Sequence, residues 1–64
     1  MTKKDYAQFA NMVSVFRKLA LSEPKPDLGY IVACNDFAFS MADIFKSDNP
    51  RFNQERFLKA CGIE

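Results

Sequence analysis

Apolar residues recur along the first third of the chain at intervals that alternate between three and four positions. They are Tyr6, Phe9, Val13, Phe16 and Ala20. This spacing places them on one face of an α-helix, and Met12, Val15 and Leu19 form a second stripe on its flank. Thr2 precedes the pattern as a capping residue, so we expect a helix over residues 3–20. An apolar arc this wide indicates contact with two neighbours.

The same spacing returns in the middle of the chain. Its members are Ile31, Cys34, Ala38, Met41 and Phe45, with Tyr30, Phe37 and Ile44 beside them. Pro24 and Pro26 lack backbone donors and break the chain before this segment. Asp27 stands where an N-cap belongs, which predicts a second helix over residues 28–46.

A third, shorter helix is predicted near the end of the chain. Proline disfavours helical geometry at Asn49, whereas Asn53 can cap a new helix and Gly62 can close it in the left-handed conformation. A helix over residues 54–61 has about two turns, too few to be stable alone in water. It must therefore dock through its apolar residues. These are Phe52, Phe57, Leu58 and Cys61.

The three segments together predict an all-α fold, a helical hairpin plus a short C-terminal helix that form a three-helix mini-bundle. The chain has 64 residues, which predicts a single helical domain over residues 1–64 near the lower limit of independent stability. Seven Phe and two Tyr partly compensate, because each aromatic side chain buries a large area. This aromatic excess also indicates a partner, either a second copy or another protein.

Charge and cysteine content exclude several classes of protein. The net charge is +1, with no basic or acidic run along the chain. Two cysteines are too few for a secreted disulfide framework, and neither a signal peptide nor an apolar stretch of membrane length is visible. We therefore expect a reduced, cytosolic, soluble protein that has no membrane partner.

The residues needed for catalysis or metal binding are sparse. The chain has no histidine and two isolated glycines, and its two cysteines, Cys34 and Cys61, are too far apart for a zinc motif. Asp36 and Asp43 could hold a cation or act as an acid–base pair, but their spacing favours a solvated face that keeps the helix soluble. Both thiols fall on apolar faces, which predicts that they are buried and inert. We expect no catalytic residue, no metal and no cofactor.

Two apolar residues fall on the polar side of the second helix and mark a candidate protein-binding site. An exposed phenylalanine flanked by carboxylates resembles the anchor and rim of a binding hot spot. The predicted site comprises Val32, Asn35, Asp36, Phe39 and Asp43. Alternatively, Phe39 packs under the third helix or under the proline loop.

Two further surfaces compete with this site. Arg51, Arg56 and Lys59 could bind nucleic acid, although Arg56 could instead pair with Asp48 or Asp43. The flank of the first helix could be buried in a twofold homodimer if the third helix leaves it uncovered. That flank comprises Met12, Val15 and Leu19.

The C-terminal run resembles the ending of a group of small proteins from phages, plasmids and integrative elements. The resemblance rests on Asn49-Pro50-Arg51-Phe52-Asn53 followed by Arg56-Phe57-Leu58-Lys59-Ala60-Cys61-Gly62, with Asn53 where aspartate is usual. Lys4-Asp5-Tyr6 and Met41-Ala42-Asp43-Ile44-Phe45 are also similar. The resemblance implies a mobile-element origin in a bacterial host and transfers no functional residues.

The function expected from these observations is non-enzymatic. Accessory proteins of this size in mobile elements often bind a host protein or inhibit a defence system, as anti-CRISPR proteins do. We therefore expect a helical protein that binds a host or element-encoded protein. The alternatives are a nucleic-acid-binding accessory factor and a homodimeric structural protein.

Overall fold

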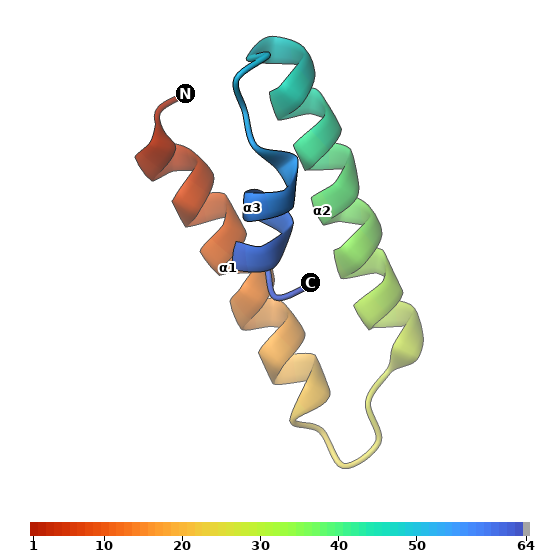
Figure 1. The fold of residues 1–64 in the computed structure, drawn as a ribbon. Coiled ribbons are helices and arrows are strands. Elements are labelled where there is room, and N and C mark those ends of the chain that lie inside the picture. The colour runs from red at the N-terminus through yellow and green to blue at the C-terminus, as the bar shows by residue number, and fades with distance from the viewer. Residues whose placement is uncertain (64) are drawn as a thin grey trace.

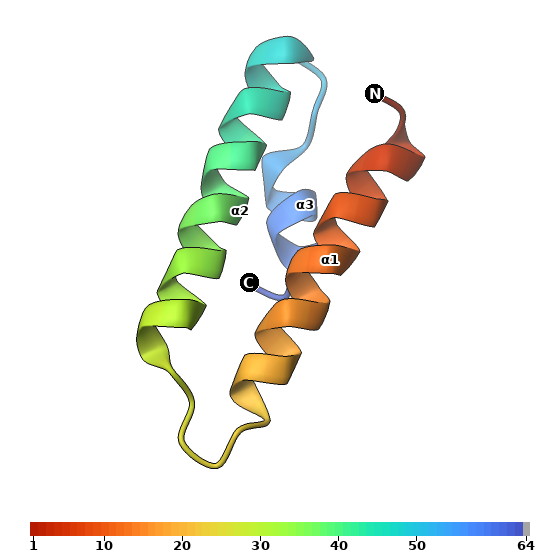
Figure 2. The ribbon, with the colours of Figure 1, turned by 180° about the vertical axis from the view of Figure 1, so that it is seen from behind.

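The computed structural model describes residues 1–63, which form three α-helices (Figure 1). They are α1 (Lys3–Leu21), α2 (Leu28–Asp48) and α3 (Gln54–Ala60). The first two helices run antiparallel as a hairpin, and α3 folds back onto one side of it (Figures 1 and 2). Every pair of helices is in contact. The predicted all-α three-helix mini-bundle is confirmed.

Each helix begins at a capping residue that the sequence identifies. The Thr2 hydroxyl accepts a hydrogen bond from the Asp5 backbone N–H at 3.3 Å, and the Asp5 carboxylate accepts one from the Thr2 N–H at 2.9 Å. Asp27 caps α2 at 3.1 Å, and Asn53 caps α3 at 3.0 Å. These side chains satisfy backbone donors that have no partner within their helix, so the helix ends lie within two residues of the predicted limits.

The segment around α3 has the backbone geometry that its sequence predicts. Asn49 before Pro50 is extended, with φ −136° and ψ 102°, and ends α2. Gly62 adopts a left-handed φ of 87°, while its N–H and that of Ile63 donate back to carbonyls in α3. The chain therefore reverses sharply at both ends of this short helix.

The hydrophobic core lies where α3 meets the hairpin. Its buried members are Ala10, Val13, Ala38, Ala42, Phe45, Phe52, Phe57, Leu58 and Cys61. Phe45 lies at the centre, with its ring centroid 4.9 to 5.9 Å from those of Tyr6, Phe9, Phe52 and Phe57. All four residues predicted to dock the third segment are buried, so this prediction is confirmed.

The helices approach each other on faces that differ partly from the predicted ones. The most deeply buried residues of α1 and α2 are Ala10, Ala38 and Ala42, which are all at most 1% exposed. Phe9 and Phe16 were expected at the centre of the first helix's core face, but they lie at its edge and stay partly exposed. The prediction that Cys34 is buried is also wrong, because this thiol is only half-buried.

Within residues 1–63, α2 is the only helix that is long and apolar enough to cross a membrane, as judged by length and composition alone. In this fold its apolar residues divide between two environments. Ala38 and Phe45 face the core, whereas Tyr30 and Phe37 are exposed. The composition of α2 thus reflects apolar residues on more than one side of the helix.

Candidate functional site

An apolar groove lies between α1 and α2. Figure 2 shows the hairpin from the side away from α3. The volume of the groove is about 420 Å³. Six large side chains form its walls, and we call them the groove face. They are Phe9, Met12 and Phe16 of α1 with Tyr30, Phe37 and Met41 of α2. Val13, Ala33 and Cys34 complete the lining, which contains no charged residue.

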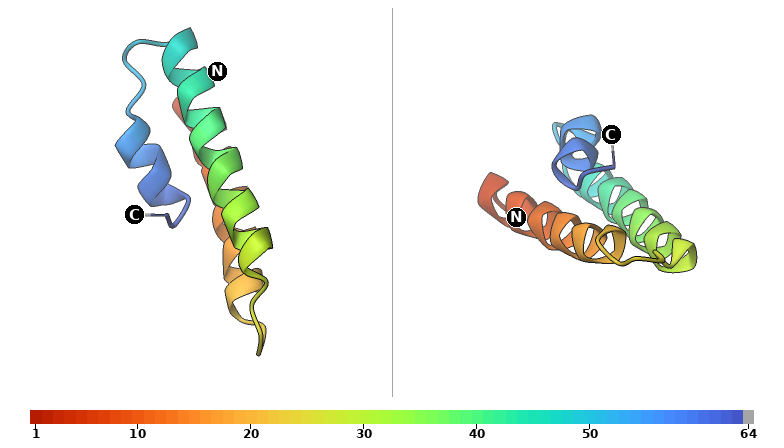
Figure 3. Two further views of the ribbon diagram at one scale, coloured as in Figure 1. Left: turned by 90° about the vertical axis from the view of Figure 1, so that its right-hand side faces the viewer. Right: turned by 90° about the horizontal axis from the view of Figure 1, so that it is seen from below.

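The groove face remains exposed because α3 covers only one side of the hairpin (Figure 3). Phe37 is 64% exposed, and Met12 and Phe16 are about half exposed. The wide apolar arc of α1 predicts two neighbours, and α1 does contact both α2 and α3, but these contacts leave the groove face uncovered. Met12, one of the three residues proposed for a homodimer, belongs to this face, while Val15 and Leu19 are exposed outside the groove lining.

A second exposed region lies on another side of α2 and contains four of the five predicted partner-binding residues. We call Val32, Asp36, Phe39 and Asp43 the Phe39 patch. Val32 is 54% exposed and Phe39 46%, so the alternative in which Phe39 is buried under α3 or the proline loop is wrong. The Asp43 carboxylate accepts a hydrogen bond from Gln54 Nε2 at 2.8 Å, which fixes the edge of the patch that borders α3.

Asn35 differs from the other predicted partner-binding residues. It is half-buried, and its Oδ1 accepts a hydrogen bond from Arg17 Nε at 2.8 Å. Arg17 also donates through Nη1 to the carbonyl oxygen of Gly62, so one guanidinium connects α1 to α2 and to the turn after α3. Asn35 therefore stabilises the contact between α1 and α2, and we leave it out of the Phe39 patch.

The structural role of Arg17 was not predicted. The sequence signal for it is a charged residue within the apolar face of α1.

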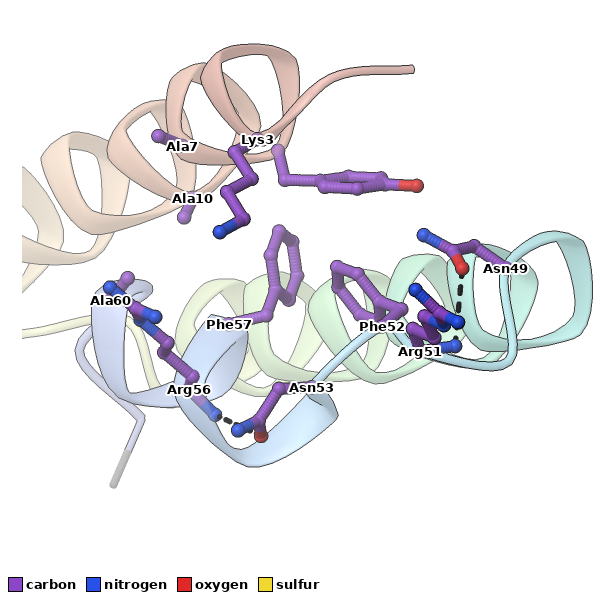
Figure 4. Close-up of a pocket in the computed structure, with 11 residues that line it drawn as sticks. Lys3, Ala7, Ala10, Asn49, Arg51, Phe52, Asn53, Arg56, Phe57 and Ala60 are labelled. Carbon is purple, nitrogen blue, oxygen red and sulfur yellow. Dashed lines mark hydrogen bonds between the residues drawn. The ribbon is translucent and has the colours of Figure 1, made fainter.

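A third surface, which we call the basic cavity, lies between the start of α1 and α3 (Figure 4). It has a volume of about 510 Å³ and brings together Lys3, Arg51 and Arg56. Its walls are largely apolar, and no Asp or Glu is among the residues that line it. Figure 4 shows Lys3 extending from α1 toward the gap, with the two arginines on the opposite wall.

The basic cavity contains two of the three residues predicted to bind nucleic acid. Arg51 and Arg56 line it, whereas Lys59 does not. Lys3 takes its place, although it is distant in the sequence. The Asp43 carboxylate, which the sequence allowed to pair with Arg56, instead accepts a hydrogen bond from Gln54.

Cys61 is buried at the centre of the contact between α3 and the hairpin. Burial raises the pKa of its thiol to about 11, although the nearby Arg17 guanidinium opposes that shift. The thiol therefore stays protonated at neutral pH and is a poor nucleophile. Among residues 1–63 no group of three or more potential metal ligands is brought together.

Comparison of the chain with protein-family models, with curated proteins and with solved structures gives no match. The three surfaces are therefore interpreted from their own geometry and chemistry.

Proposed function

We propose that the protein is a non-enzymatic helical interaction protein of a phage or other mobile element, and that it binds a host or element-encoded protein through the Phe39 patch. The observation that carries this proposal is the exposure of Phe39 and Val32 beside two carboxylates after α3 has docked. Neither side chain is needed to complete the core.

The chemistry of the Phe39 patch defines the kind of partner that fits it. A half-exposed aromatic ring gains most when it enters a pocket that excludes water. Asp36 and Asp43 lie two helical turns apart on the same side of α2, and they favour lysine or arginine around that pocket. The expected partner surface is thus an apolar pocket with a basic rim.

The proposed biological role is inhibition of a bacterial defence complex, in the manner of anti-CRISPR proteins. The small size of the chain supports this role, as does the resemblance of its C-terminal run to mobile-element proteins. In this role the Phe39 patch would occlude a surface that the complex needs.

We expect a variant carrying both Phe39→Ala and Asp43→Asn to lose at least tenfold in affinity for the partner. Truncating a central aromatic anchor commonly costs 2 kcal/mol or more, roughly a thirtyfold change in the dissociation constant. The partner is first isolated from the bacterial host by affinity purification. Its binding to the purified wild-type and variant proteins is then measured by titration calorimetry.

Leu21→Ala is the control for this experiment. Leu21 is also a large exposed side chain, but it lies at the end of α1, outside the patch and outside the groove lining. We expect this variant to bind as the wild type does, and both variants to keep the wild-type circular-dichroism spectrum. Unchanged affinity of the Phe39/Asp43 variant would exclude the Phe39 patch as the partner-binding site.

The basic cavity favours a second candidate function, a nucleic-acid-binding accessory factor. Lys3, Arg51 and Arg56 place three cationic side chains around one cavity that has no acidic lining residue. Such a group can neutralise phosphates and release their counterions. The aromatic rings of Phe52 and Phe57 are buried beneath it, so the support comes from charge and not from base stacking.

For this second candidate we expect binding to short DNA duplexes to weaken steeply with salt. Three phosphate contacts give a slope of about −2.7 in a plot of log affinity against log salt concentration. Replacing Arg51 and Arg56 with glutamine should reduce that slope by about two units, while Lys25→Gln in the exposed loop should leave it unchanged. A gel-shift titration that gives no complex at low salt rejects this function.

A further inference from the structure

We propose that the groove face binds the groove face of a second copy of this chain, so that two hairpins form a four-helix core with twofold symmetry. This inference is independent of the proposed function because it uses the side of α2 away from the Phe39 patch. It also differs from the homodimer expected from the sequence, because both helices of the hairpin contribute.

The hairpin lacks a second layer over most of its length. A helical domain is stable when each apolar face is covered by another layer of structure. The seven residues of α3 span about 10 Å, whereas the 19 residues of α1 and the 21 of α2 span about 30 Å. Figure 3 shows α3 on one side of the hairpin, which leaves the other side uncovered. A second hairpin would supply a layer of matching length.

The exposed apolar residues repeat in a way that suits packing against helices. Phe9 and Phe16 are seven positions apart, as are Tyr30 and Phe37. The series continues beyond the groove lining with Leu19, seven positions after Met12. A seven-residue repeat keeps side chains facing one partner along aligned helices. Apolar side chains repeated every seven residues on both helices favour binding of another helix over binding of a compact ligand.

The area available is close to what a stable dimer requires. Five of the six groove-face side chains are exposed by 37% to 64%. Because a large side chain of this kind has a surface of about 200 Å², they offer on the order of 500 Å² of apolar area per copy. Leu19 and Ile44 extend these stripes and are 60% and 65% exposed. The total approaches the roughly 800 Å² that each partner buries in a standard interface.

The charge distribution allows the groove face to pair with itself. In a twofold interface the same surface patch of both copies meets, so a patch that carried charge of one sign would repel its copy. No charged side chain lines the groove, and the nine basic and eight acidic residues lie elsewhere on the chain. Pairing of two groove faces therefore brings no charged side chains of the groove lining together.

Dimerisation would change what the protein presents to other molecules. The half-buried thiol of Cys34 lies on the floor of the groove and would be covered by the second copy. The Phe39 patches, which lie on another side of α2, would stay exposed on both copies. The dimer would therefore carry two identical surfaces and gain avidity for a partner with repeated sites.

The test is the mass of the protein in solution, measured by light scattering coupled to size exclusion over a hundredfold range of concentration. The monomer mass is 7.3 kDa, and we expect twice this value at high concentration. Phe37→Glu should shift the protein to a monomer, because each copy would bury an unpaired carboxylate in an apolar interface. Phe39→Glu, the same substitution on the other flank of α2, should stay dimeric. Both residues are exposed, so circular dichroism should show folded protein in each case.

Thiol labelling identifies the face that is covered. We expect Cys34 to react with a thiol reagent at least tenfold more slowly at concentrations where the wild type is dimeric, and the difference to disappear in Phe37→Glu. A wild type that stays monomeric throughout overturns the proposal, including a monomer that sediments with phosphatidylcholine vesicles. A dimer that survives Phe37→Glu with unchanged Cys34 reactivity overturns it as well, because another surface would then form the interface.

Discussion

Replacing Phe45 with alanine is expected to unfold most of the protein at 25 °C. Phe45 is 9% exposed, and its ring contacts those of Tyr6, Phe9, Phe52 and Phe57. Truncating a buried phenylalanine lowers the free energy of unfolding by about 3 to 5 kcal/mol. A domain of 64 residues has a total stability of about the same size, so a loss of this magnitude removes most of it.

Urea titrations followed by circular dichroism at 222 nm measure this effect. All variants must be compared at one protein concentration, because self-association would add to the apparent stability. Phe39→Ala is the matched control: the residue type and the helix are the same, but the side chain is 46% exposed. We expect it to change the free energy of unfolding by less than about 1 kcal/mol. If both variants unfold at the same urea concentration, the aromatic cluster is not the centre of the fold.

The sequence predicts the helix limits because local chemistry determines them. Thr2, Asp27 and Asn53 cap their own helices through bonds to residues three positions away. Gly62 needs no distant contact to adopt a positive φ. Such features depend on short stretches of chain and can be recognised without knowledge of the tertiary structure.

The side of each helix that faces the core was harder to predict. Periodicity identifies an apolar arc, but it does not show which part of the arc meets a neighbouring helix. Large residues such as Phe9 and Phe16 seemed the natural centre of the arc in α1. The most deeply buried residue of α1 is instead Ala10, which is 1% exposed. Hydrophobicity alone therefore misplaced the core by part of a helical turn.

The Phe39 patch and the groove face, the two exposed apolar surfaces of α2, also differ in how readily they can be predicted from the sequence. Val32 and Phe39 break the polar side of the helix, so the Phe39 patch could be recognised as an exception. The groove face breaks no pattern, since Phe37 and Met41 fit the spacing of core residues. Its exposure follows from the tertiary arrangement, because α3 packs on one side of the hairpin and leaves the other side uncovered (Figure 3). The periodicity of α1 and α2 does not show which side α3 covers.

Replacing Arg17 with methionine is expected to lower the free energy of unfolding by about 2 kcal/mol and to loosen the end of the chain. The substitution keeps an unbranched apolar stem but removes the hydrogen bonds to Asn35 and to the Gly62 carbonyl. Hydrogen bonds from charged groups contribute about 1.5 to 3 kcal/mol each, and water can partly replace the exposed one at Gly62. Because Arg17 is the contact between α1 and the turn after α3, opening of that turn should become easier.

Labelling of Cys61 separates this local effect from a general loss of stability. Cys61 is fully buried next to the turn, so it reacts only when α3 opens. In a Cys34→Ser background under native conditions, Arg17→Met should speed labelling of Cys61 about tenfold, which corresponds to 1.4 kcal/mol. Lys18→Met, one position along the same helix and exposed, should leave the rate unchanged. Equal rates for both variants would mean that Arg17 does not hold α3 on the hairpin, and that the buried aromatic side chains alone keep it there.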